Sequence, residues 1–505
     1  MWQMKNELLI EIGKNSLALL AGVFLTLACA PFYVFPSALI SAAFILILWL
    51  NISPGLAFRR GFFYGLGLFG SGVYWVYISM HTIAMLPALV AGLLTILFVS
   101  CLALFPAAQG YYLNRFFPRS NNAKILCAFP AFWVLCEWVR SWLFSGFPWL
   151  FIGYSQTHSP LKGYAPLGGI YAVSLVTILS AALIVNAIRY LRIKQHKTAY
   201  FNLLLLVFLW TLGGLLNLIS WTHPQGKPFQ VSLVQANIPQ QLKWQAEQVL
   251  PTLEEYKNLS ENHWDSQLVI WPESAIPAPL TEVIDFVNQM AETATQHHSQ
   301  LITGVPVKNI HNNRYFNAVI SVGTAGNGYY LKRRLVPFGE FIPFERMLGP
   351  VFDILHVPMS DFTPDHNYPQ PLTLHDNIKM LAFICYEIAF PEQVLQSIHD
   401  VGLLLTVTND SWFGHSIAQA QHLQIAQMRA IETGRPLLFA SNNGITAIIS
   451  QQGNVLAAAP PFQTYVLTGQ VQAYSGQTPW QKFAMDPVLL TALILLSIAI
   501  KYRRT

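Results

Sequence analysis

The first 221 residues alternate long apolar stretches with short polar ones, and one more apolar stretch lies near the end of the chain. Each stretch approaches the roughly 20 residues that an α-helix needs to cross a bilayer. The pattern therefore predicts a membrane bundle of eight transmembrane helices. We place these helices near residues 15–33, 36–52, 62–80, 84–112, 124–144, 167–190, 202–221 and 487–501.

The first apolar stretch has a second interpretation. Leu27-Ala-Cys-Ala30 loosely resembles the small-residue cleavage site of a signal peptide. Pro31 follows immediately and the sequence then becomes apolar again, which favours a retained helix. The rest of the expected topology is the same in both cases.

The distribution of lysine and arginine predicts the orientation. These residues lie before the first stretch, in every second loop and after the last stretch, whereas the intervening loops are nearly free of them apart from Lys162. Because cytoplasmic loops are enriched in basic residues, we expect cytoplasmic termini, with residues 222–486 outside, which in a bacterium is the periplasm. The basic residues are Lys5, Lys14, Arg59, Arg60, Arg115, Arg119, Lys124, Arg189, Arg192, Lys194, Lys197, Lys501, Arg503 and Arg504.

Residues 222–486 have a different pattern, in which strand-like runs are interleaved with helix-like ones. This indicates one α/β domain with paired layers. The expected domains are thus 1–221 with seven membrane helices, 222–486, and 487–505 with the eighth helix and a cytoplasmic tail. Strands are expected at Phe229–Ala236, Leu268–Trp271, Leu301–Val307, Phe316–Val322, Tyr329–Val336, Met380–Ile384, Leu403–Val407, Leu437–Ala440, Thr446–Ser450 and Tyr465–Gln470. Helices are expected at Glu247–Asn262, Thr281–His297, Pro391–Val401 and His415–Thr433.

Composition agrees with a membrane protein and narrows the chemistry. Of 505 residues, 53% are hydrophobic and only 10% are charged, whereas soluble domains carry roughly a quarter charged residues. The net charge of +5 is modest, and no basic stretch is dense enough to indicate nucleic-acid binding. The chain has no Walker loop, no GxGxxG after a strand, and no CxxC or HExxH motif, and the fourteen histidines lack ligand spacing, so we expect neither a metal nor a cofactor.

Two features of the membrane part go beyond spanning. Glu137 and Arg140 lie three residues apart on one face of a predicted helix, where charges cost several kcal/mol unless they are paired. They fit a structural ion pair, or a role in binding headgroups or anchoring the domain. The next stretch, Ser145–Tyr154, is rich in Gly, Pro and aromatic residues, and fits either a lipid-guiding loop or an interfacial aromatic belt.

Cys385 is the leading candidate nucleophile. The other cysteines, at positions 29, 101, 127 and 136, lie in apolar membrane-type segments, so Cys385 has no disulfide partner in the α/β part. It follows the apolar run Met380–Ile384 and precedes a helix-like stretch that begins at Pro391. A thiol at such a place is expected to have a lowered pKa and amide donors for an oxyanion nearby. The alternative is a buried structural cysteine.

Two other reactive side chains lie at comparable positions. Glu273 follows the strand-like run at 269–272, and Lys332 ends the run at 329–332. Strand ends of α/β sheets gather at one crevice. There a carboxylate can take the thiol proton, the thiolate can attack a carbonyl, and the ammonium can stabilise the oxyanion. Taken singly, each residue is more typical of a surface charge or a helix cap.

Short motifs along the α/β part resemble the nitrilase, or carbon–nitrogen hydrolase, superfamily. With the membrane helices, the whole chain resembles the bacterial apolipoprotein N-acyltransferase family. Each motif alone is weak, but in combination they are specific, and Pro272 is the one departure. Together with the membrane helices, the resemblance covers nearly the entire chain. The motifs are Val234-Gln-Ala-Asn-Ile-Pro-Gln240 with Trp244, Trp271-Pro-Glu-Ser-Ala-Ile-Pro277, Lys332-Arg-Arg-Leu-Val-Pro-Phe-Gly-Glu-Phe-Ile-Pro343, Ile384-Cys-Tyr-Glu387, Thr408-Asn-Asp-Ser-Trp-Phe-Gly414, and Gln421-His422 through Met428-Arg-Ala-Ile-Glu-Thr-Gly-Arg435.

The resemblance implies an αββα sandwich with a catalytic triad. Glu273 would be the general base, Lys332 the oxyanion stabiliser and Cys385 the nucleophile. Glu340 would be a second carboxylate that positions Lys332. The other implied site residues are Tyr386 and Glu387, which would line the pocket, and Trp244 and Trp412, which would cover the acyl chain, gate access or simply pack.

The implied reaction is ping-pong acyl transfer in the bacterial inner membrane. Cys385 would take the sn-1 acyl chain of a phospholipid, with phosphatidylethanolamine as the suggested donor, and form a thioester. The α-amino group of a lipoprotein's diacylglyceryl-cysteine would then accept the chain, which is the last step of lipoprotein maturation.

Three other functions are compatible with parts of the pattern. A membrane-tethered amidase needs the same triad, although a single anchor would be enough for it. A non-enzymatic lipid or lipoprotein carrier would keep its function after Cys385→Ser. A transporter is disfavoured because the membrane part shows no internal repeat and few charges.

Overall fold

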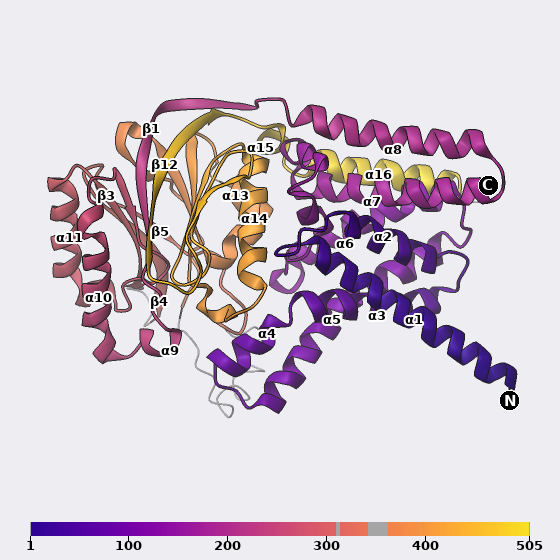
Figure 1. Ribbon diagram of the computed structural model, residues 1–505, viewed down its shortest axis with the longest axis horizontal. Helices are drawn as coiled ribbons and strands as arrows, with labels where there is room; N and C mark the ends of the chain where they lie inside the picture. Colours follow the sequence, from indigo (N-terminus) through magenta and orange to yellow (C-terminus); the bar gives the residue numbers. More distant parts are fainter. Residues whose placement is uncertain (1, 310–313, 342–361, 397, 504–505) are drawn as a thin grey trace. The chain divides into compact units, whose positions relative to one another are not determined.

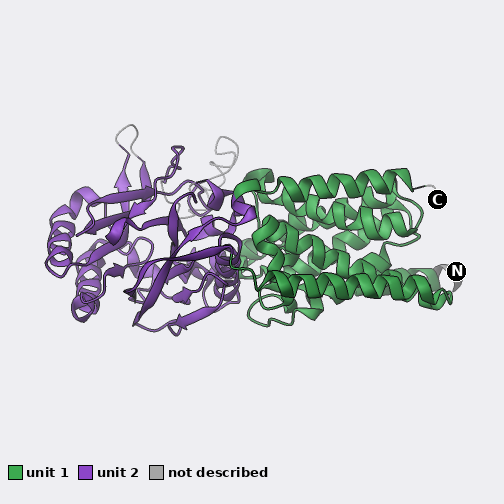
Figure 2. Cartoon of the chain, turned by 90° about the horizontal axis from the view of Figure 1, so that it is seen from above, with its two compact units in different colours: residues 1–77, 88–220, 482–505 green, residues 78–87, 221–481 purple. Residues whose placement is uncertain are grey.

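The structure, a computed structural model, describes residues 2–309, 314–341, 362–396 and 398–503 (Figure 1). The chain forms two compact units, which Figure 2 colours separately. Unit 1 comprises Met1–Tyr77, Ala88–Ser220 and Lys482–Thr505, and unit 2 comprises Ile78–Pro87 and Trp221–Gln481. The sequence predictions that fall outside the described residues concern Ile342 and Pro343 of one motif, position 397 of an expected helix, and Arg504 of the basic tail.

Unit 1 is built from helices, and each expected apolar stretch overlaps one of them. Several have the length and composition of membrane spans, whereas α2 and α16 have only 13 and 16 residues. The segments long and apolar enough to cross a membrane, among the described residues, are Asn6–Ala28, Ala88–Phe116, Ala123–Ser145, Pro160–Arg192 and His196–Leu216. The helices are α1 (Trp2–Ala28), α2 (Pro36–Leu48), α3 (Pro54–Gly72), α4 (Trp75–Ile78), α5 (Ala88–Phe116), α6 (Phe129–Trp142), α7 (Ala165–Arg192), α8 (His196–Leu216) and α16 (Asp486–Lys501).

Helix α3 begins earlier than the sequence predicts, so Arg59 and Arg60 lie inside a helix and not in a loop. The side chain of Ser53 caps the helix, and Pro54 occupies its first position. Arg59 Nη2 lies 2.7 Å from a Glu11 carboxylate oxygen, and Arg60 Nη2 lies 3.0 Å from the other. Pairing with Glu11 of α1 explains how an apolar helix carries two adjacent charges.

Helices α1 and α3 approach each other closely because each presents a glycine to the backbone of the other. A Cβ atom at Gly22 would collide with the carbonyl oxygen of Tyr64, and one at Gly67 would collide with that of Leu19. Small residues that allow such close approach are typical of packed membrane helices.

Unit 2 contains two sheets of six strands each, in the orders β12-β1-β2-β3-β4-β5 and β11-β10-β9-β8-β7-β6. At the centre of each sheet three strands are parallel, β1-β2-β3 in the first and β7-β8-β9 in the second. The first sheet consists of β1 (Thr222–Gln235), β2 (Leu268–Ile270), β3 (Gln300–Lys308), β4 (Tyr315–Gly323), β5 (Gly328–Leu331) and β12 (Tyr465–Gly476). The second consists of β6 (Leu372–Thr373), β7 (Lys379–Ile384), β8 (Val401–Thr408), β9 (Leu437–Ser441), β10 (Ala447–Ile449) and β11 (Val455–Ala458).

The sheets pack face to face because both sides of their central strands are apolar. Leu268 and Ile270 of β2 lie in the core between the sheets, with Leu405 of β8. Val269 and Trp271 lie in a second core, beneath α10 (Ala246–Ser260) and α11 (Ile284–Gln296), and α14 (Ala418–Thr433) contacts β9 of the other sheet (Figure 1). The α/β fold with two sheets, expected from the sequence, is confirmed. The shorter helices are α9 (Gln240–Lys243), α13 (Pro391–Leu395) and α15 (Pro479–Phe483).

Candidate active site

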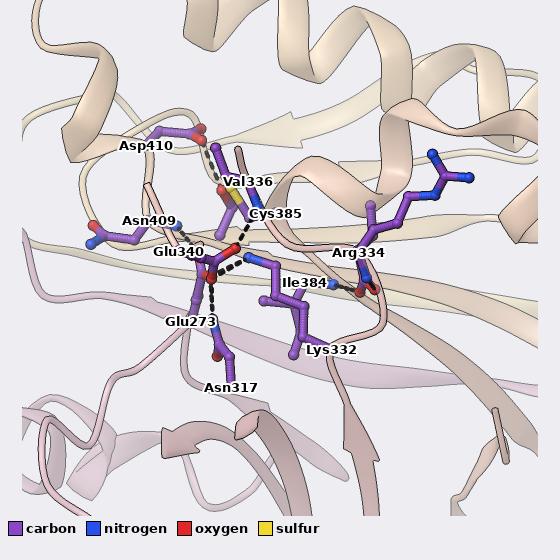
Figure 3. A network of polar contacts seen from close by, with 12 residues as sticks. Glu273, Asn317, Lys332, Arg334, Val336, Glu340, Ile384, Cys385, Asn409 and Asp410 are labelled. Carbon is purple, nitrogen blue, oxygen red and sulfur yellow. Dashed lines mark hydrogen bonds and ion pairs between the residues drawn. The ribbon is translucent and has the colours of Figure 1, made fainter. Parts of the chain in front are cut away.

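The ends of four strands bring polar residues to one edge of the sandwich. Strand β2 leads to Glu273, β5 to Lys332, β7 to Cys385 and β8 to Asn409. Carboxyl ends of parallel strands meet at the same edge of a sheet, and β5 has the direction of β3 because two antiparallel pairings separate them. The structure thus brings Glu273, Lys332 and Cys385 together (Figure 3).

Lys332 lies between two carboxylates. Its Nζ is 3.1 Å from Oε1 of Glu273 and 2.9 Å from Oε1 of Glu340, and its side chain is only 1% exposed. Asn317 donates to both of these carboxylate oxygens, at 2.8 and 3.1 Å. The backbone amide of Asn409 donates to the other oxygen of Glu273 at 2.9 Å. Hydrogen bonds therefore fix the orientation of every charged group in the cluster.

Glu273 and Lys332 stay charged at neutral pH. Burial by itself raises the pKa of Glu273, but the charges of Lys332 and Lys243 and the hydrogen bond from Asn317 outweigh it, so that the pKa is lowered. Burial acts to lower the pKa of Lys332, but the carboxylates of Glu273 and Glu340 raise it overall. At pH 7 Glu273 is therefore an ionised base beside a permanent cation.

Cys385 has a backbone φ of 53°, in the left-handed region, and its side chain is partly buried. A lowered thiol pKa, which we expect from the sequence, is wrong. Burial raises the pKa of Cys385 well above its ordinary value, the charges of Glu273 and Asp410 add to the effect, and Lys332 offsets only part of it. The thiol is protonated at neutral pH, so it needs a base before it can attack.

Lys332 follows β5 and begins a loop, whereas the sequence predicts a strand that continues to residue 336. The amides of Arg333 and Arg334 donate to Oε1 of Glu387, at 2.7 and 3.0 Å, and not to a neighbouring strand. A side-chain carboxylate thus replaces the partners that a strand would need, and the chain leaves the sheet at Lys332.

Glu387 has no exposed surface, and its carboxylate holds two segments together. Its Oε2 accepts from the hydroxyl of Tyr330 at 2.9 Å and from the amide of Ile384 at 2.8 Å. Gln393 donates to Oε1 at 2.8 Å. The resemblance implies that Glu387 lines a pocket, whereas the structure shows a buried carboxylate that ties the end of β7 to the loop after β5.

The other three expected site residues lie outside this hydrogen-bonded cluster of described residues. Tyr386 is partly buried, with its ring edge-to-face on Phe390 at 5.0 Å. Trp244 directly follows α9 and is 48% exposed. Trp412 lies in the short turn η10 (Asp410–Phe413), and its carbonyl accepts a hydrogen bond from Ser79 Oγ at 2.6 Å.

The sequence analysis does not single out Lys243, Asn317 or Asn409. Lys243 is 2% exposed and donates to the carbonyl of Glu273 at 3.0 Å, and burial lowers its pKa to about 8. A signal was available for each of them: Lys243 directly precedes Trp244, Asn317 interrupts an apolar strand, and Asn409 lies in the motif Thr408–Gly414. Among the described residues, no group of three or more His, Cys, Asp or Glu side chains is arranged to hold a metal.

The charged residues expected on one face of helix α6 do not use each other as their main partners. Glu137 accepts from Trp133 Nε1 at 3.1 Å and from the amide of Ile152 at 2.8 Å. Arg140 donates to the carbonyls of Phe147 and Trp149, at 3.1 and 2.6 Å. Both side chains therefore hold the segment 147–152 against α6.

A two-sheet α/β sandwich with a thiol, a carboxylate and an ammonium at its strand ends defines a protein of the carbon–nitrogen hydrolase class. The family model described as Carbon-nitrogen hydrolase matches residues 230–479, and the one described as Apolipoprotein N-acyltransferase N-terminal domain matches residues 21–183. The chain belongs to the apolipoprotein N-acyltransferase family.

Individual relatives agree with this assignment over nearly the full length. A Coxiella burnetii protein named apolipoprotein N-acyltransferase is 42% identical over 95% of this chain and 98% of its own. A Methylococcus capsulatus protein of the same name is 40% identical over 97% of this chain and 96% of its own. Among solved structures, Saccharomyces cerevisiae Nit3 of the nitrilase superfamily is 15% identical, with a TM-score of 0.37, over 49% of this chain and 91% of its own.

Proposed function

We propose that this protein is an apolipoprotein N-acyltransferase that works by ping-pong transfer through a thioester on Cys385. The donor is the sn-1 acyl chain of a phospholipid, and the acceptor is the N-terminal amine of a diacylglyceryl-cysteine lipoprotein. The observation that carries the proposal is the protonated thiol of Cys385 beside the ionised cluster of Glu273, Lys332 and Glu340, in a chain of this family.

In the first half-reaction Glu273 takes the thiol proton as Cys385 Sγ bonds to the ester carbonyl carbon. An ammonium has three N–H groups, of which the two carboxylates take two within the described residues, so Lys332 keeps one to stabilise the oxyanion. The ester C–O bond then breaks. The glycerol oxygen receives the proton from Glu273 and leaves as a lysophospholipid.

In the second half-reaction the amine attacks the thioester carbonyl. Glu273 takes a proton from the nitrogen as the C–N bond forms, the C–S bond breaks, and the sulfur of Cys385 recovers the proton. The product is an N-acylated lipoprotein and free enzyme. A thioester yields readily to an amine, which explains why a cysteine serves better than a serine as carrier of the chain.

The remaining site residues support these steps. Glu340 holds Lys332 in place, and Glu387 fixes the loop of the nucleophile through its hydrogen bonds. We assign Tyr386, Trp244 and Trp412 to the acyl-chain site, where the half-exposed ring of Trp244 provides apolar surface.

We further propose that eight helices anchor the protein in the bacterial inner membrane. Residues 1–221 and 487–505 form the membrane part with cytoplasmic ends, and residues 222–486 form a periplasmic catalytic domain, which the distribution of basic residues supports. Donor and acceptor are both anchored in the outer leaflet, so an anchored site meets them at high effective concentration. Phosphatidylethanolamine is the proposed donor.

The test is intact mass spectrometry of the purified protein after incubation with phosphatidylethanolamine, with Cys385→Ala as the matched control. We expect a fatty-acyl mass increment on the wild type that hydroxylamine removes and that the variant lacks. If the wild type lacks this increment and hydrolyses small amides, the protein is a membrane-tethered amidase and not an acyltransferase.

A further inference from the structure

A buried histidine contacts the backbone of the nucleophile. His422 lies on α14, has no exposed surface and lies against the rings of Phe413 and Phe439. Its Nε2 is 3.1 Å from the carbonyl oxygen of Cys385, and its Nδ1 is 3.1 Å from Oδ1 of Asp410. The reaction steps described above use neither His422 nor Asp410.

These two contacts determine where hydrogen atoms are needed. A peptide carbonyl only accepts hydrogen bonds, so Nε2 of His422 carries a hydrogen and donates it. Nδ1 faces Oδ1 of Asp410 at hydrogen-bond distance, so Asp410 fixes the orientation of the ring.

Cys385 needs such a contact because of its backbone conformation. A residue with a Cβ atom is strained in the left-handed region and stays there only where its surroundings hold it. The amide of Ile384, just before Cys385, is held by Glu387 at 2.8 Å, and the carbonyl of Cys385 is held by His422. These contacts lie on either side of the Cα atom of Cys385.

Asp410 is also connected to the thiol side. Its Oδ1 accepts a hydrogen bond from the hydroxyl of Thr408 at 2.8 Å, and that hydroxyl is itself hydrogen-bonded to the Cys385 side chain. Asp410 therefore reaches Cys385 by two routes, through His422 to the carbonyl and through Thr408 to the sulfur.

We propose that His422, supported by Asp410, is a positioning residue that holds the peptide carbonyl of Cys385 and so aims Sγ at the acyl carbonyl. The inference rests on the proposed acyl transfer. A displacement of about 1 Å at a reacting atom can cost about 100-fold in rate. Loss of the His422 contact is therefore expected to slow thioester formation without weakening lipid binding.

The experiment follows acyl-enzyme formation by intact mass in the full-length protein mixed with phosphatidylethanolamine at several concentrations. His422→Phe keeps a ring but removes both hydrogen bonds. We expect its rate at saturating lipid to fall roughly 30- to 100-fold, with the half-saturating lipid concentration changed less than about twofold. The control is His415→Gln, an exposed histidine just before α14, which should behave as the wild type.

Two conservative variants separate positioning from general support of the fold. The side-chain amide of glutamine in His422→Gln can donate to the Cys385 carbonyl. We therefore expect this variant to form the acyl-enzyme at least about tenfold faster than His422→Phe. Asp410→Asn can donate to Nδ1 and leave the hydrogen on Nε2, so we expect a rate within about fivefold of the wild type. Thermal unfolding of each variant gives its Tm.

A wild-type rate in folded His422→Phe would overturn the proposal. Equal rate losses in the Phe and Gln variants with matching losses in Tm would also overturn it, because they indicate only structural support. If His422→Phe does not fold, His422→Gln and Asp410→Asn provide the test. Acylation rates of these two variants as low as that of Cys385→Ala would overturn the proposal. A wild type that forms no acyl-enzyme rejects the proposed function instead, and iodoacetamide alkylation rates of Cys385 then test positioning separately.

Discussion

The protein buries charge in two different ways. In unit 2, Lys332 faces Glu273 and Glu340, so the ionised side chains bind one another. In unit 1, Arg140 binds two backbone carbonyls, and its guanidinium lies 5.2 and 4.7 Å from the ring centroids of Phe69 and Phe151. Glu137 likewise binds a backbone amide and an indole.

The two kinds of contact suit different roles, a reactive site in unit 2 and the support of a loop in unit 1. Charged side chains that bind one another can exchange partners and protons as a substrate enters, because each has a titrating neighbour. A charge whose hydrogen bonds go to backbone groups and whose face lies on aromatic rings instead fixes the loop that supplies those groups. Glu137 and Arg140 have the spacing of a helical ion pair, yet their partners show that they secure the segment 147–152.

The largest expected effect is the difference in acylation rate between Glu273→Gln and Glu137→Gln. Glu273→Gln removes the base and keeps the shape of the side chain, so acyl-enzyme formation should fall about 10³-fold. Glu137→Gln should leave the rate per folded molecule within about twofold of the wild type, because its carboxylate binds a backbone amide and an indole of unit 1. Time courses of acylation by intact mass measure both, and a similar loss in both variants would contradict the comparison.

The next effect concerns stability. Arg140→Met leaves two buried carbonyls without their donor, which is expected to cost about 2–4 kcal/mol and to lower Tm by several degrees. Acylation by the protein that remains folded should be nearly unchanged. Arg115→Met, at an exposed arginine of α5, is the matched control. An unchanged Tm for Arg140→Met would show that the segment does not depend on this residue.

The pH dependence tests the charge states of unit 2. The lowered pKa of Glu273 keeps the base ionised, and the raised pKa of Cys385 keeps the thiol protonated across the neutral range. Acylation should therefore be nearly constant from about pH 5.5 to about pH 8 and fall only when acid protonates Glu273. A rate that rises about tenfold per pH unit over this range would instead indicate attack by a free thiolate.

The smallest expected effect comes from Lys243. Its charge helps to lower the pKa of Glu273, so Lys243→Met should raise that pKa and move the acid limb of the pH profile to higher pH. The plateau rate should change less than about threefold, because Lys332 still accompanies the base. Lys243→Arg keeps the charge and is the control. If the acid limb of Lys243→Met lies at the same pH as that of the wild type, the charge of Lys243 does not lower the pKa of Glu273.

Sequence periodicity predicts the sandwich because its central strands are apolar on both faces. The same reasoning misses β11, whose side chains are mostly exposed, and β6, which has only two residues. It also extends β5 too far, because the carboxylate that ends this strand comes from Glu387, more than fifty positions away in the chain. Local patterns do not contain such distant partners.

The same limit applies to the site. Strand ends predict that Glu273, Lys332 and Cys385 meet, because topology alone brings them to one edge. The pKa of the thiol depends on burial and on nearby carboxylates, which follow from tertiary packing, and so the expectation of a lowered pKa is wrong. The contact from His422 to Cys385 likewise joins α14 to the end of β7.

The stretch Ile78–Pro87 belongs to unit 2, although the chain on both sides of it belongs to unit 1. Within it lies η1 (Ser79–Ile83), whose Ser79 donates to the carbonyl of Trp412. Unit 2, the domain that contains Cys385, is therefore discontinuous in the sequence. Expression from residue 221 onward would omit a native part of that domain, and a soluble version needs this peptide grafted back or supplied in trans.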